Sequence, residues 1–151
     1  MDSPRDVEPA GANAARRIIL LAAAIAGALG VLLGAFGAHG LPDHLSTSYA
    51  GVVDDDSLPR LIAKRVGQFD TGARYHLVHA VAMLAVGCWP FRDGLPRIAA
   101  WLMLAGILLF SGSLYALVLS NQTWLGAITP LGGLSWIVAW LMVAFAAWKS
   151  T

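Results

Sequence analysis

The chain has 151 residues, of which 58% are hydrophobic and 13% are charged, and its formal net charge is +1. Soluble domains of this size are less apolar, so this composition and a mean hydropathy of +0.67 indicate an integral membrane protein. The small net charge, without a basic patch interleaved with aromatic residues, excludes nucleic acid as a partner, and the single cysteine, Cys88, excludes an intramolecular disulfide.

The composition of the first fifteen residues predicts a tail without fixed structure. Residues 1–15 combine Pro, Gly, Asn and charges of both signs with almost no large apolar side chain. Such a segment cannot bury enough apolar surface to offset its ordering entropy. We therefore predict a disordered N-terminal tail, followed by a transmembrane domain over residues 16–151.

Four apolar runs follow the tail, and each is about long enough to cross a hydrocarbon core of about 30 Å. They cover about residues 18–38, 72–89, 98–119 and 125–148. The second run is the least apolar because Arg74 lies in its first turn, from where the guanidinium can reach the lipid headgroups. The runs predict an all-α fold, a compact bundle of four transmembrane helices.

The first apolar run has an alternative interpretation as a cleaved signal peptide, because two arginines precede it and small residues close it. We favour a retained helix. Small residues recur every four positions on one face of the run: Ala26, Gly30, Gly34 and Ala38. Such a stripe lets a second helix approach closely, which matters only if the helix stays in the protein.

The first loop, residues 39–71, is the only sizeable segment outside the predicted spans. One set of apolar residues in it has helical spacing: Leu58, Leu61, Ile62, Val66 and Phe69. Ser57 suits an N-cap and Pro59 a first turn. We predict a short amphipathic helix on the outer membrane surface, or alternatively a helix that covers the end of the bundle. The acidic run of residues 54–56 is interpreted as a solvated turn, because no spaced set of cation ligands accompanies it.

The distribution of Lys and Arg predicts the orientation. Six lie on the side of the two termini and the second loop: Arg5, Arg16, Arg17, Arg92, Arg97 and Lys149. Four lie on the opposite side: Arg60, Lys64, Arg65 and Arg74. Both termini are therefore predicted to be cytoplasmic.

Polar residues of the predicted spans converge on one end of the bundle, the outer end. This candidate polar cluster comprises His39, His76, His79, Ser111, Ser113, Tyr115 and Thr129. Polar groups are costly in lipid, so the cluster can mark a site for an ion, a proton or a small polar ligand. We favour the alternative that the hydroxyls bond between helices while His and Tyr lie at the interface, because such residues commonly hold small bundles together.

Glycines of the same spans predict close helix contacts, since a helix backbone approaches most closely where side chains are absent. These candidates are Gly30, Gly34, Gly112, Gly132 and Gly133.

The candidate ligands for a metal ion are His39, His76 and His79, because neutral imidazole binds zinc and copper. Their spacing is not that of two histidines four residues apart on a helix, and no thiolate joins them. We therefore predict neither a metal nor a cofactor. The sequence also lacks a nucleophile elbow, a phosphate-binding loop and paired intramembrane carboxylates, so we predict that the protein is not an enzyme.

The chain contains four motifs in this order: residues 34–40 (GAFGAHG), 75–79 (YHLVH), 110–115 (FSGSLY) and 129–133 (TPLGG). Together they resemble domain-of-unknown-function family 423, a group of small bacterial inner-membrane proteins similar to eukaryotic transmembrane protein 256. The resemblance covers about residues 18–148 and implies a four-span protein of the bacterial plasma (inner) membrane without an established activity. The chain departs from the family in a longer first loop, with an insertion at about residues 49–58, and in Phe69, where the family has tryptophan.

Two classes of function remain. The favoured one is a non-enzymatic membrane protein that acts through helix–helix assembly, as a homo-oligomer or with an unidentified membrane partner, in the lipid bilayer. The alternative is a small transporter, channel or ion-binding protein that uses the candidate polar cluster. The direction of the Ser111, Ser113 and Tyr115 hydroxyls discriminates between them, since transport requires a connected polar cavity.

Overall fold

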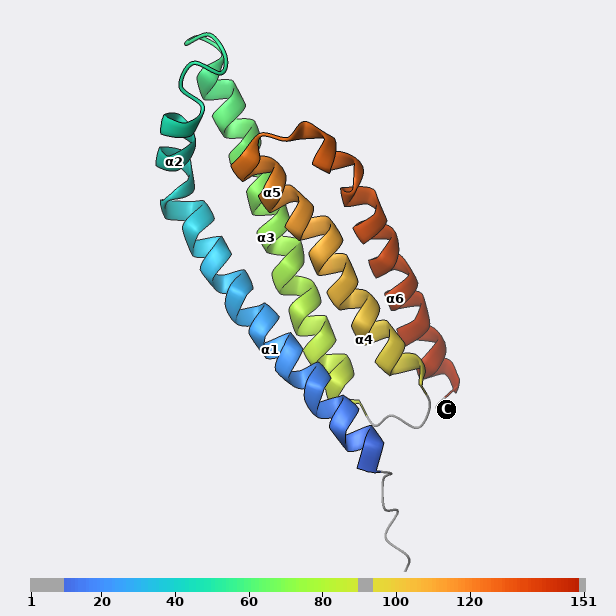
Figure 1. The fold of residues 1–151 in the computed structure, drawn as a ribbon. Helices are drawn as coiled ribbons and strands as arrows, with labels where there is room; N and C mark the ends of the chain where they lie inside the picture. The colour runs from blue at the N-terminus through green and yellow to red at the C-terminus, as the bar shows by residue number, and fades with distance from the viewer. Residues whose placement is uncertain (1–9, 90–93, 150–151) are drawn as a thin grey trace, which may run out of the picture.

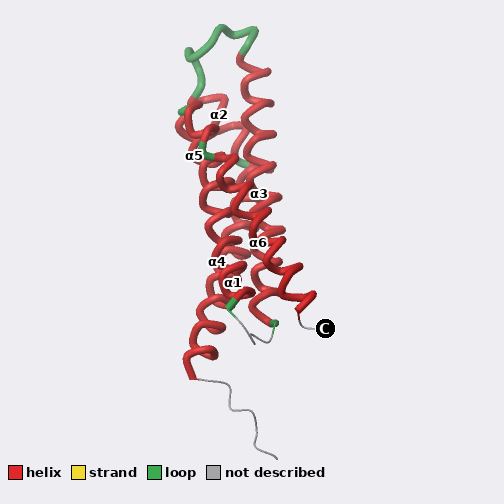
Figure 2. Tube along the Cα trace, turned by 90° about the vertical axis from the view of Figure 1, so that its right-hand side faces the viewer, coloured by secondary structure: helices red, strands yellow, loops and turns green. Residues whose placement is uncertain are grey.

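The computed structural model describes residues 10–89 and 94–149, and all regular structure in these ranges is helical. The elements are α1 (Ala10–His39), α2 (Leu41–Ser48), α3 (Leu58–Cys88), α4 (Leu95–Gly106), η1 (Ile107–Ser111), α5 (Gly112–Ser120), η2 (Thr123–Ala127) and α6 (Thr129–Lys149). Figure 1 shows α1, α3, the continuous rod α4–η1–α5 and α6 side by side in one bundle. Figure 2 shows the same elongated bundle from the side, with α2 at the end that carries the loop to α3.

Within the described residues, three helical segments are long and apolar enough to cross a membrane: Asn13–His39, Leu95–Ser120 and Thr123–Lys149. They contain three of the four predicted apolar runs. α3 contains the fourth run and packs between α1 and the α4–η1–α5 rod, but the Lys, Arg and Asp residues of its first half lower its hydropathy. The all-α fold class is therefore confirmed, with three candidate spans.

The first loop differs from the prediction of a separate interfacial helix. Residues 58–88 form one uninterrupted helix, α3, so the predicted amphipathic segment is its first half. The apolar side of that segment packs on α2 and α5 in a cluster with these buried members: Leu41, Leu45, Tyr49, Phe69, Leu117 and Val118. No helix-breaking residue separates the segment from the second apolar run, and its apolar side is covered by protein. The segment thus covers the end of the bundle, which was the alternative.

The start of α3 follows the predicted signals. Ser57 is its N-cap and Pro59 lies in the first turn. The side chain of Ser57 does not cap the helix, because its hydroxyl donates to the Asp54 carboxylate at 3.0 Å and its backbone N–H donates to the same carboxylate at 2.8 Å. These two hydrogen bonds hold the pKa of Asp54 below its ordinary value. Asp54 therefore closes an exposed turn, as the interpretation of residues 54–56 requires.

At the opposite end of the bundle, α1 begins earlier than the predicted span. The helix starts at Ala10, inside the segment predicted as a disordered tail, and residues 1–9 lie outside the described residues. Arg16 of this extension donates to the carbonyls of Gly87 and Cys88, each at 3.1 Å. Because the last carbonyls of a helix lack intrahelical partners, Arg16 satisfies the end of α3 and fixes α1 beside it.

Candidate functional site

The relative position of α1 and α3 sets the depth of the two α3 histidines. Gly37 lies against Phe69, Gly30 against Leu77, and Gly87 against Leu20. His76 and His79 therefore lie beside the middle of the apolar run of residues 18–38, and not at its outer end as predicted. The difference arises because the part of α3 beside this apolar run begins at about Phe69, before the predicted start of the second span at residue 72.

His79 lies in the middle of the bundle with both ring nitrogens engaged. Its Nδ1 is 2.8 Å from the Tyr75 carbonyl oxygen, and its Nε2 is 3.4 Å from Nε1 of Trp140. An indole N–H only donates and a carbonyl only accepts, so Nδ1 carries the proton and Nε2 accepts. The imidazole is therefore neutral, and neither nitrogen is free for a ligand.

The ring of His79 stacks on Trp136 of α6, with centroids 3.7 Å apart and planes 5° apart. The indole N–H of Trp136 in turn donates to the Met103 carbonyl of α4 at 3.1 Å. A Cβ at Gly106 would overlap this indole, so the glycine makes the room that Trp136 occupies. Tryptophan favours the membrane interface, so a tryptophan in the middle of a span is unusual. Together with a glycine in the middle of the neighbouring span, it was the sequence signal for the contact of Trp136 with Gly106. Our predictions missed this signal.

The rod α4–η1–α5 contains one π-helical turn, η1, at the level of this stack. The N–H of Gly112 bonds to the Ile107 carbonyl, five residues earlier. The neighbouring α6 side chains bond to carbonyls just before the turn, since Ser135 donates to Leu102 at 2.8 Å. π-Turns interrupt the regular α-helical pattern and often occur at functional sites. Here Phe110, within the turn, contacts the ring of Trp136 of α6.

Ser113 and Thr129 connect α5 to α6. The Ser113 hydroxyl donates to the Phe110 carbonyl at 2.9 Å and lies 2.9 Å from the Thr129 hydroxyl. Because Ser113 has only one proton, it accepts from Thr129. Both hydroxyls therefore serve a helix contact. Ser111 is fully buried, and its hydroxyl finds no hydrogen-bond partner among the described residues.

His76 occupies a different place, between α1 and α5. Its Nδ1 is 3.3 Å from the Tyr115 hydroxyl, and the ring edge faces Gly30 of α1. Gly72 makes room for Tyr115, since a Cβ there would be 3.1 Å from the tyrosine ring. His39, at the end of α1, is exposed and takes part in none of these contacts. The candidate polar cluster is thus divided into separate helix contacts.

The predicted packing glycines also differ among themselves. A Cβ at Gly132 would lie 2.7 Å from Cβ of Phe110 and still closer to its backbone nitrogen, so α6 and η1 touch there through their backbones. A Cβ at Gly30 would lie 2.8 Å from Cδ2 of Leu77, the end of a flexible side chain. At Gly34, no atom of another side chain or element lies within 4 Å, and at Gly112 and Gly133 the nearest is 3.9 Å away. Gly132 therefore requires glycine, an added Cβ at Gly30 requires Leu77 to move, and the other three positions have room for a Cβ.

Among the described residues, grooves with apolar walls open laterally on the bundle in two places. The groove between α3 and α6 has a volume of about 490 Å³ and is lined by Tyr75, Val78, His79, Phe110, Gly133, Trp136, Ile137 and Trp140. The groove between α1 and α4 has a volume of about 280 Å³ and is lined by Ala22, Ile25, Ala26, Leu29, His76, Leu104, Ile107 and Leu108. Neither resembles a polar path across the bundle.

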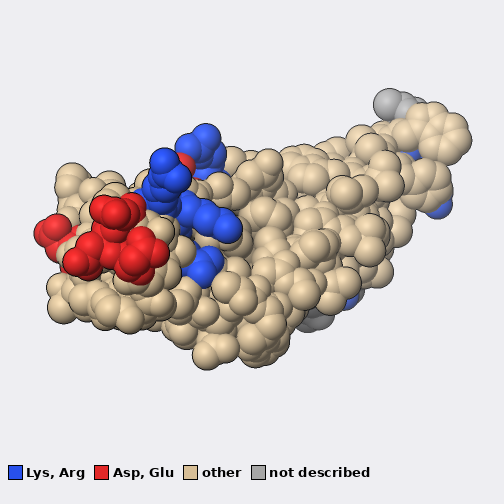
Figure 3. All heavy atoms as spheres, turned by 90° about the horizontal axis from the view of Figure 1, so that it is seen from above, with Lys and Arg blue, Asp and Glu red and all other residues tan. Residues whose placement is uncertain are grey.

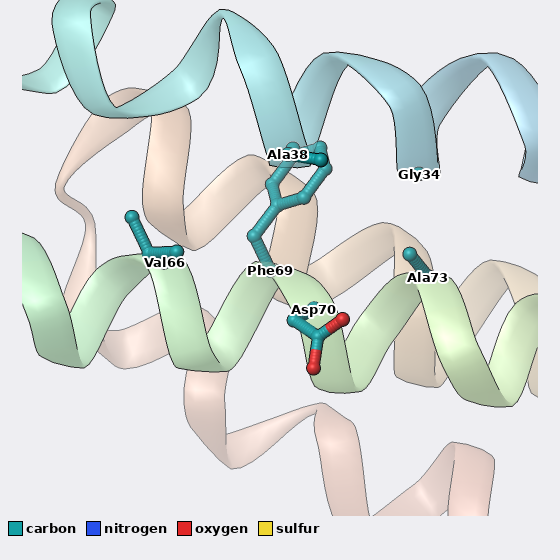
Figure 4. Close-up of a pocket in the computed structure, with 7 residues that line it drawn as sticks. Gly34, Ala38, Val66, Phe69, Asp70 and Ala73 are labelled. Atoms are coloured by element: carbon teal, nitrogen blue, oxygen red, sulfur yellow. The ribbon is translucent and has the colours of Figure 1, made fainter.

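A smaller pocket of about 150 Å³ lies between α1 and α3, and small residues of the GAFGAHG motif form its α1 wall. Figure 4 shows Phe69 of α3 reaching toward Ala38 of α1, while the carboxylate of Asp70 turns away from α1. Asp70 forms an ion pair with Arg74 one turn further along α3. Our prediction placed a helix backbone against Gly34. In the structure Gly34 instead borders the open space of this pocket.

A buried arginine holds the outer end of the bundle together. Arg65 of α3 is 4% exposed and donates to the side-chain oxygens of Asn121 at 2.6 Å and Gln68 at 3.0 Å. Asn121 ends α5 with a φ of +56°, which asparagine tolerates better than most residues. Tyr49, after α2, donates to the Val118 carbonyl at 2.7 Å. No sequence spacing predicts the contacts of Arg65 with Asn121 and of Tyr49 with Val118, because these partners are far apart in the chain.

The described residues contain no group of three or more His, Cys, Asp or Glu side chains that could hold a metal ion. The three candidate metal ligands are accordingly apart, with His39 at the end of α1 and with His76 and His79 engaged on different sides of α3.

Comparisons with known proteins agree with the resemblance of the motifs. Residues 33–133 match the model of a family described as "Protein of unknown function (DUF423)". UPF0382 membrane protein YwdK of Bacillus subtilis is 39% identical over 136 residues, which cover 88% of this chain and 98% of that protein. A UPF0382 membrane protein of Haemophilus influenzae is 38% identical over 128 residues, 84% of this chain and 90% of that protein. No solved structure matches the chain significantly.

Proposed function

The chain belongs to the DUF423 family of bacterial membrane proteins, and from that premise we propose that it acts without chemistry of its own, through helix–helix assembly in the inner membrane. The bundle would present its outer helix faces to a membrane partner, and its interior would serve only to hold those faces in place. Neither catalysis nor transport is part of this proposal.

One observation carries the proposal: the side chains of His79, Ser113 and Tyr115 take part in contacts between helices. His79 of α3 accepts from Trp140 of α6, while its Nδ1 donates to the Tyr75 carbonyl of its own helix, and Ser113 bonds to Thr129. The Tyr115 hydroxyl faces His76. An ion or proton pathway needs polar groups that line a connected cavity and can exchange partners. Dry interhelical bonds are instead the pattern by which small membrane bundles gain a fixed shape.

The experiment that tests this function is a flux assay. The full chain reconstituted into liposomes should pass protons and K⁺ no faster than empty liposomes, and His79→Phe should not change the result. The measurement is the decay of an imposed pH or K⁺ gradient. A flux that requires the protein and disappears in His79→Phe would contradict the proposal and favour the small transporter or channel.

We further propose that α3 is the fourth membrane-spanning helix, with both termini in the cytoplasm. Its 31 residues, from Leu58 to Cys88, exceed the length that a membrane requires. Its buried residues extend from Arg65 to Gly87, and it contacts α1 and the α4–η1–α5 rod. An even number of crossings leaves the two termini on one side, whereas three crossings would separate them.

Reporter fusions test this topology. A fusion after Lys149 and one at Gly94 should report the cytoplasm, and one at Asp55 should report the outside, because the side with more Lys and Arg stays inside. The readout is a pair of reporters active on opposite sides of the membrane. A reporter at Asp55 on the cytoplasmic side would reverse the orientation. Termini on opposite sides would show that α3 does not cross.

A further inference from the structure

We propose that the groove between α1 and α4 binds an isoprenoid quinone, whose carbonyl oxygen accepts a hydrogen bond from Nε2 of His76. His76 lies in a groove wall that otherwise consists of Ala, Ile and Leu side chains. The inference adds a lipid-soluble ligand to the proposed function and does not depend on it. It concerns binding alone, and no reaction of the quinone is part of it.

The first argument is a buried nitrogen without a partner. His76 is 5% exposed, and its Nδ1 is 3.3 Å from the Tyr115 hydroxyl. The other nitrogen, Nε2, is buried and makes no hydrogen bond to the described residues. The side of the ring that carries Nε2 faces α1, because the adjacent Cδ2 lies beside Gly30. A buried polar atom of this kind destabilises a protein until a further group completes its hydrogen bond.

The surroundings of the ring decide which nitrogen carries the proton. The Ala26 carbonyl of α1 interacts with the ring, but it accepts from the Gly30 N–H within the helix and makes no hydrogen bond with Nε2. A lone pair on Nε2 would face this carbonyl oxygen, and two acceptors repel each other. The proton therefore lies on Nε2, while the Tyr115 hydroxyl donates to Nδ1. The ligand must offer an acceptor.

The depth of the groove restricts the ligand further. Ala26 is the central residue of the candidate span Asn13–His39, and Ile107 and Leu108 lie at the centre of Leu95–Ser120. All three residues line the groove. The centre of a hydrocarbon core is about 15 Å from either surface, so the headgroup of a phospholipid cannot supply the acceptor.

The charge distribution agrees with this depth. Figure 3 shows Lys, Arg, Asp and Glu gathered at one end of the molecule, while the long remainder of that view is nearly free of charge. The groove opens past exposed apolar side chains, since Leu29 is 49% and Leu108 65% exposed. Such side chains suit lipid. A ligand therefore reaches His76 from the hydrocarbon, where water is scarce and a charged group is costly.

An isoprenoid quinone meets each of these requirements. It is uncharged, its carbonyl oxygens accept hydrogen bonds, and its tail dissolves in the interior of a bilayer. The groove volume of about 280 Å³ is at the lower end for small-molecule sites. It suits the quinone ring, with the tail continuing into lipid. A phospholipid acyl chain fits the apolar walls equally well but leaves Nε2 without a partner.

The larger groove between α3 and α6 provides an internal control. It is also apolar and opens laterally, but its histidine, His79, uses Nδ1 for Tyr75 and Nε2 for Trp140. Each groove has an exposed aliphatic residue in its wall, Leu108 between α1 and α4 and Ile137, 59% exposed, between α3 and α6. The same substitution at these two positions fills one groove at a time.

Quinone binding to the groove variants tests the location of the site. The full chain, in nanodiscs of quinone-free phospholipid, is titrated with a decyl-substituted benzoquinone, and the retained quinone is measured by its ultraviolet absorbance. Leu108→Trp should weaken binding about tenfold, because the indole occupies the groove, while Ile137→Trp should bind as the parent does. Thermal unfolding shows that each variant is folded. No binding by the parent, or equal binding by the two variants, would overturn the proposal.

Removal of either hydrogen-bonding group tests the recognition. His76→Phe keeps a ring but lacks the donor, so it should bind the quinone about tenfold more weakly than the parent does. Decylbenzene, which has no carbonyl, should bind the parent and His76→Phe equally, at that weaker level. If His76→Phe does not fold, the two compounds still differ on the parent. A parent that binds the quinone and decylbenzene equally tightly would overturn the proposal, since the groove would then take up any hydrocarbon.

Discussion

Gly132→Ala is expected to destabilise the protein strongly, while Gly133→Ala is not. A Cβ at Gly132 would press on the backbone of Phe110 in η1, which cannot rotate away as a side chain can. The two helices must separate, and overpacking of this kind costs about 3 kcal/mol. At Gly133 the nearest atom is 3.9 Å from the added Cβ, and it belongs to the Phe110 ring. That substitution should change stability by no more than about 1 kcal/mol, in the stabilising direction.

Each variant adds one methyl group, and the two positions are adjacent. The same expression system, detergent and fluorescence measurement therefore serve for both. Denaturant unfolding in micelles, followed by tryptophan fluorescence, gives both free energies. Gly34→Ala provides a second control in open space. Equal losses of unfolding free energy at residues 132 and 133 would show that α6 and η1 are not in backbone contact. That result would contradict the described arrangement of these two helices.

The packing glycines show how far one sequence can predict a membrane bundle. Apolar run length predicted helices at residues 18–38, 98–119 and 125–148, because a span must be long and apolar whatever it touches. The same reasoning cannot distinguish Gly132 from Gly133 or Gly30 from Gly34. Each pair is similar in sequence, and only the position of the neighbouring helix decides which glycine is in contact.

The first half of α3 shows a second limit. Its apolar spacing predicted an amphipathic helix correctly, but periodicity does not say whether lipid or protein covers the apolar side. Leu41 and Leu45 of α2 cover it, and α2 itself was not predicted. For the same reason His76 and His79 were placed too far toward the outer end. Their depth depends on the contacts of α3 with α1, such as Phe69 against Gly37, which a sequence does not contain.

His79→Ala is expected to cost about 3 kcal/mol of unfolding free energy, because it removes a buried ring from the centre of the bundle and leaves a cavity beside Trp136. His79→Phe keeps a ring for the stack but loses the bonds to Tyr75 and Trp140. It should therefore cost less, about 1 kcal/mol. His39→Ala, at an exposed helix end, should change the free energy by less than about 0.5 kcal/mol.

The same variants decide whether a metal is involved. A metal ligand must offer a nitrogen lone pair, and the only lone pair of neutral His79 accepts from Trp140. Added zinc or copper should therefore leave the melting temperature of the parent unchanged, and the order of stability should remain parent, His79→Phe, His79→Ala with or without metal. A bound metal would stabilise the fold by mass action. If zinc raised the melting temperature of the parent but not of His79→Phe, the histidine would be a ligand, and the ion-binding function would replace assembly as the better proposal.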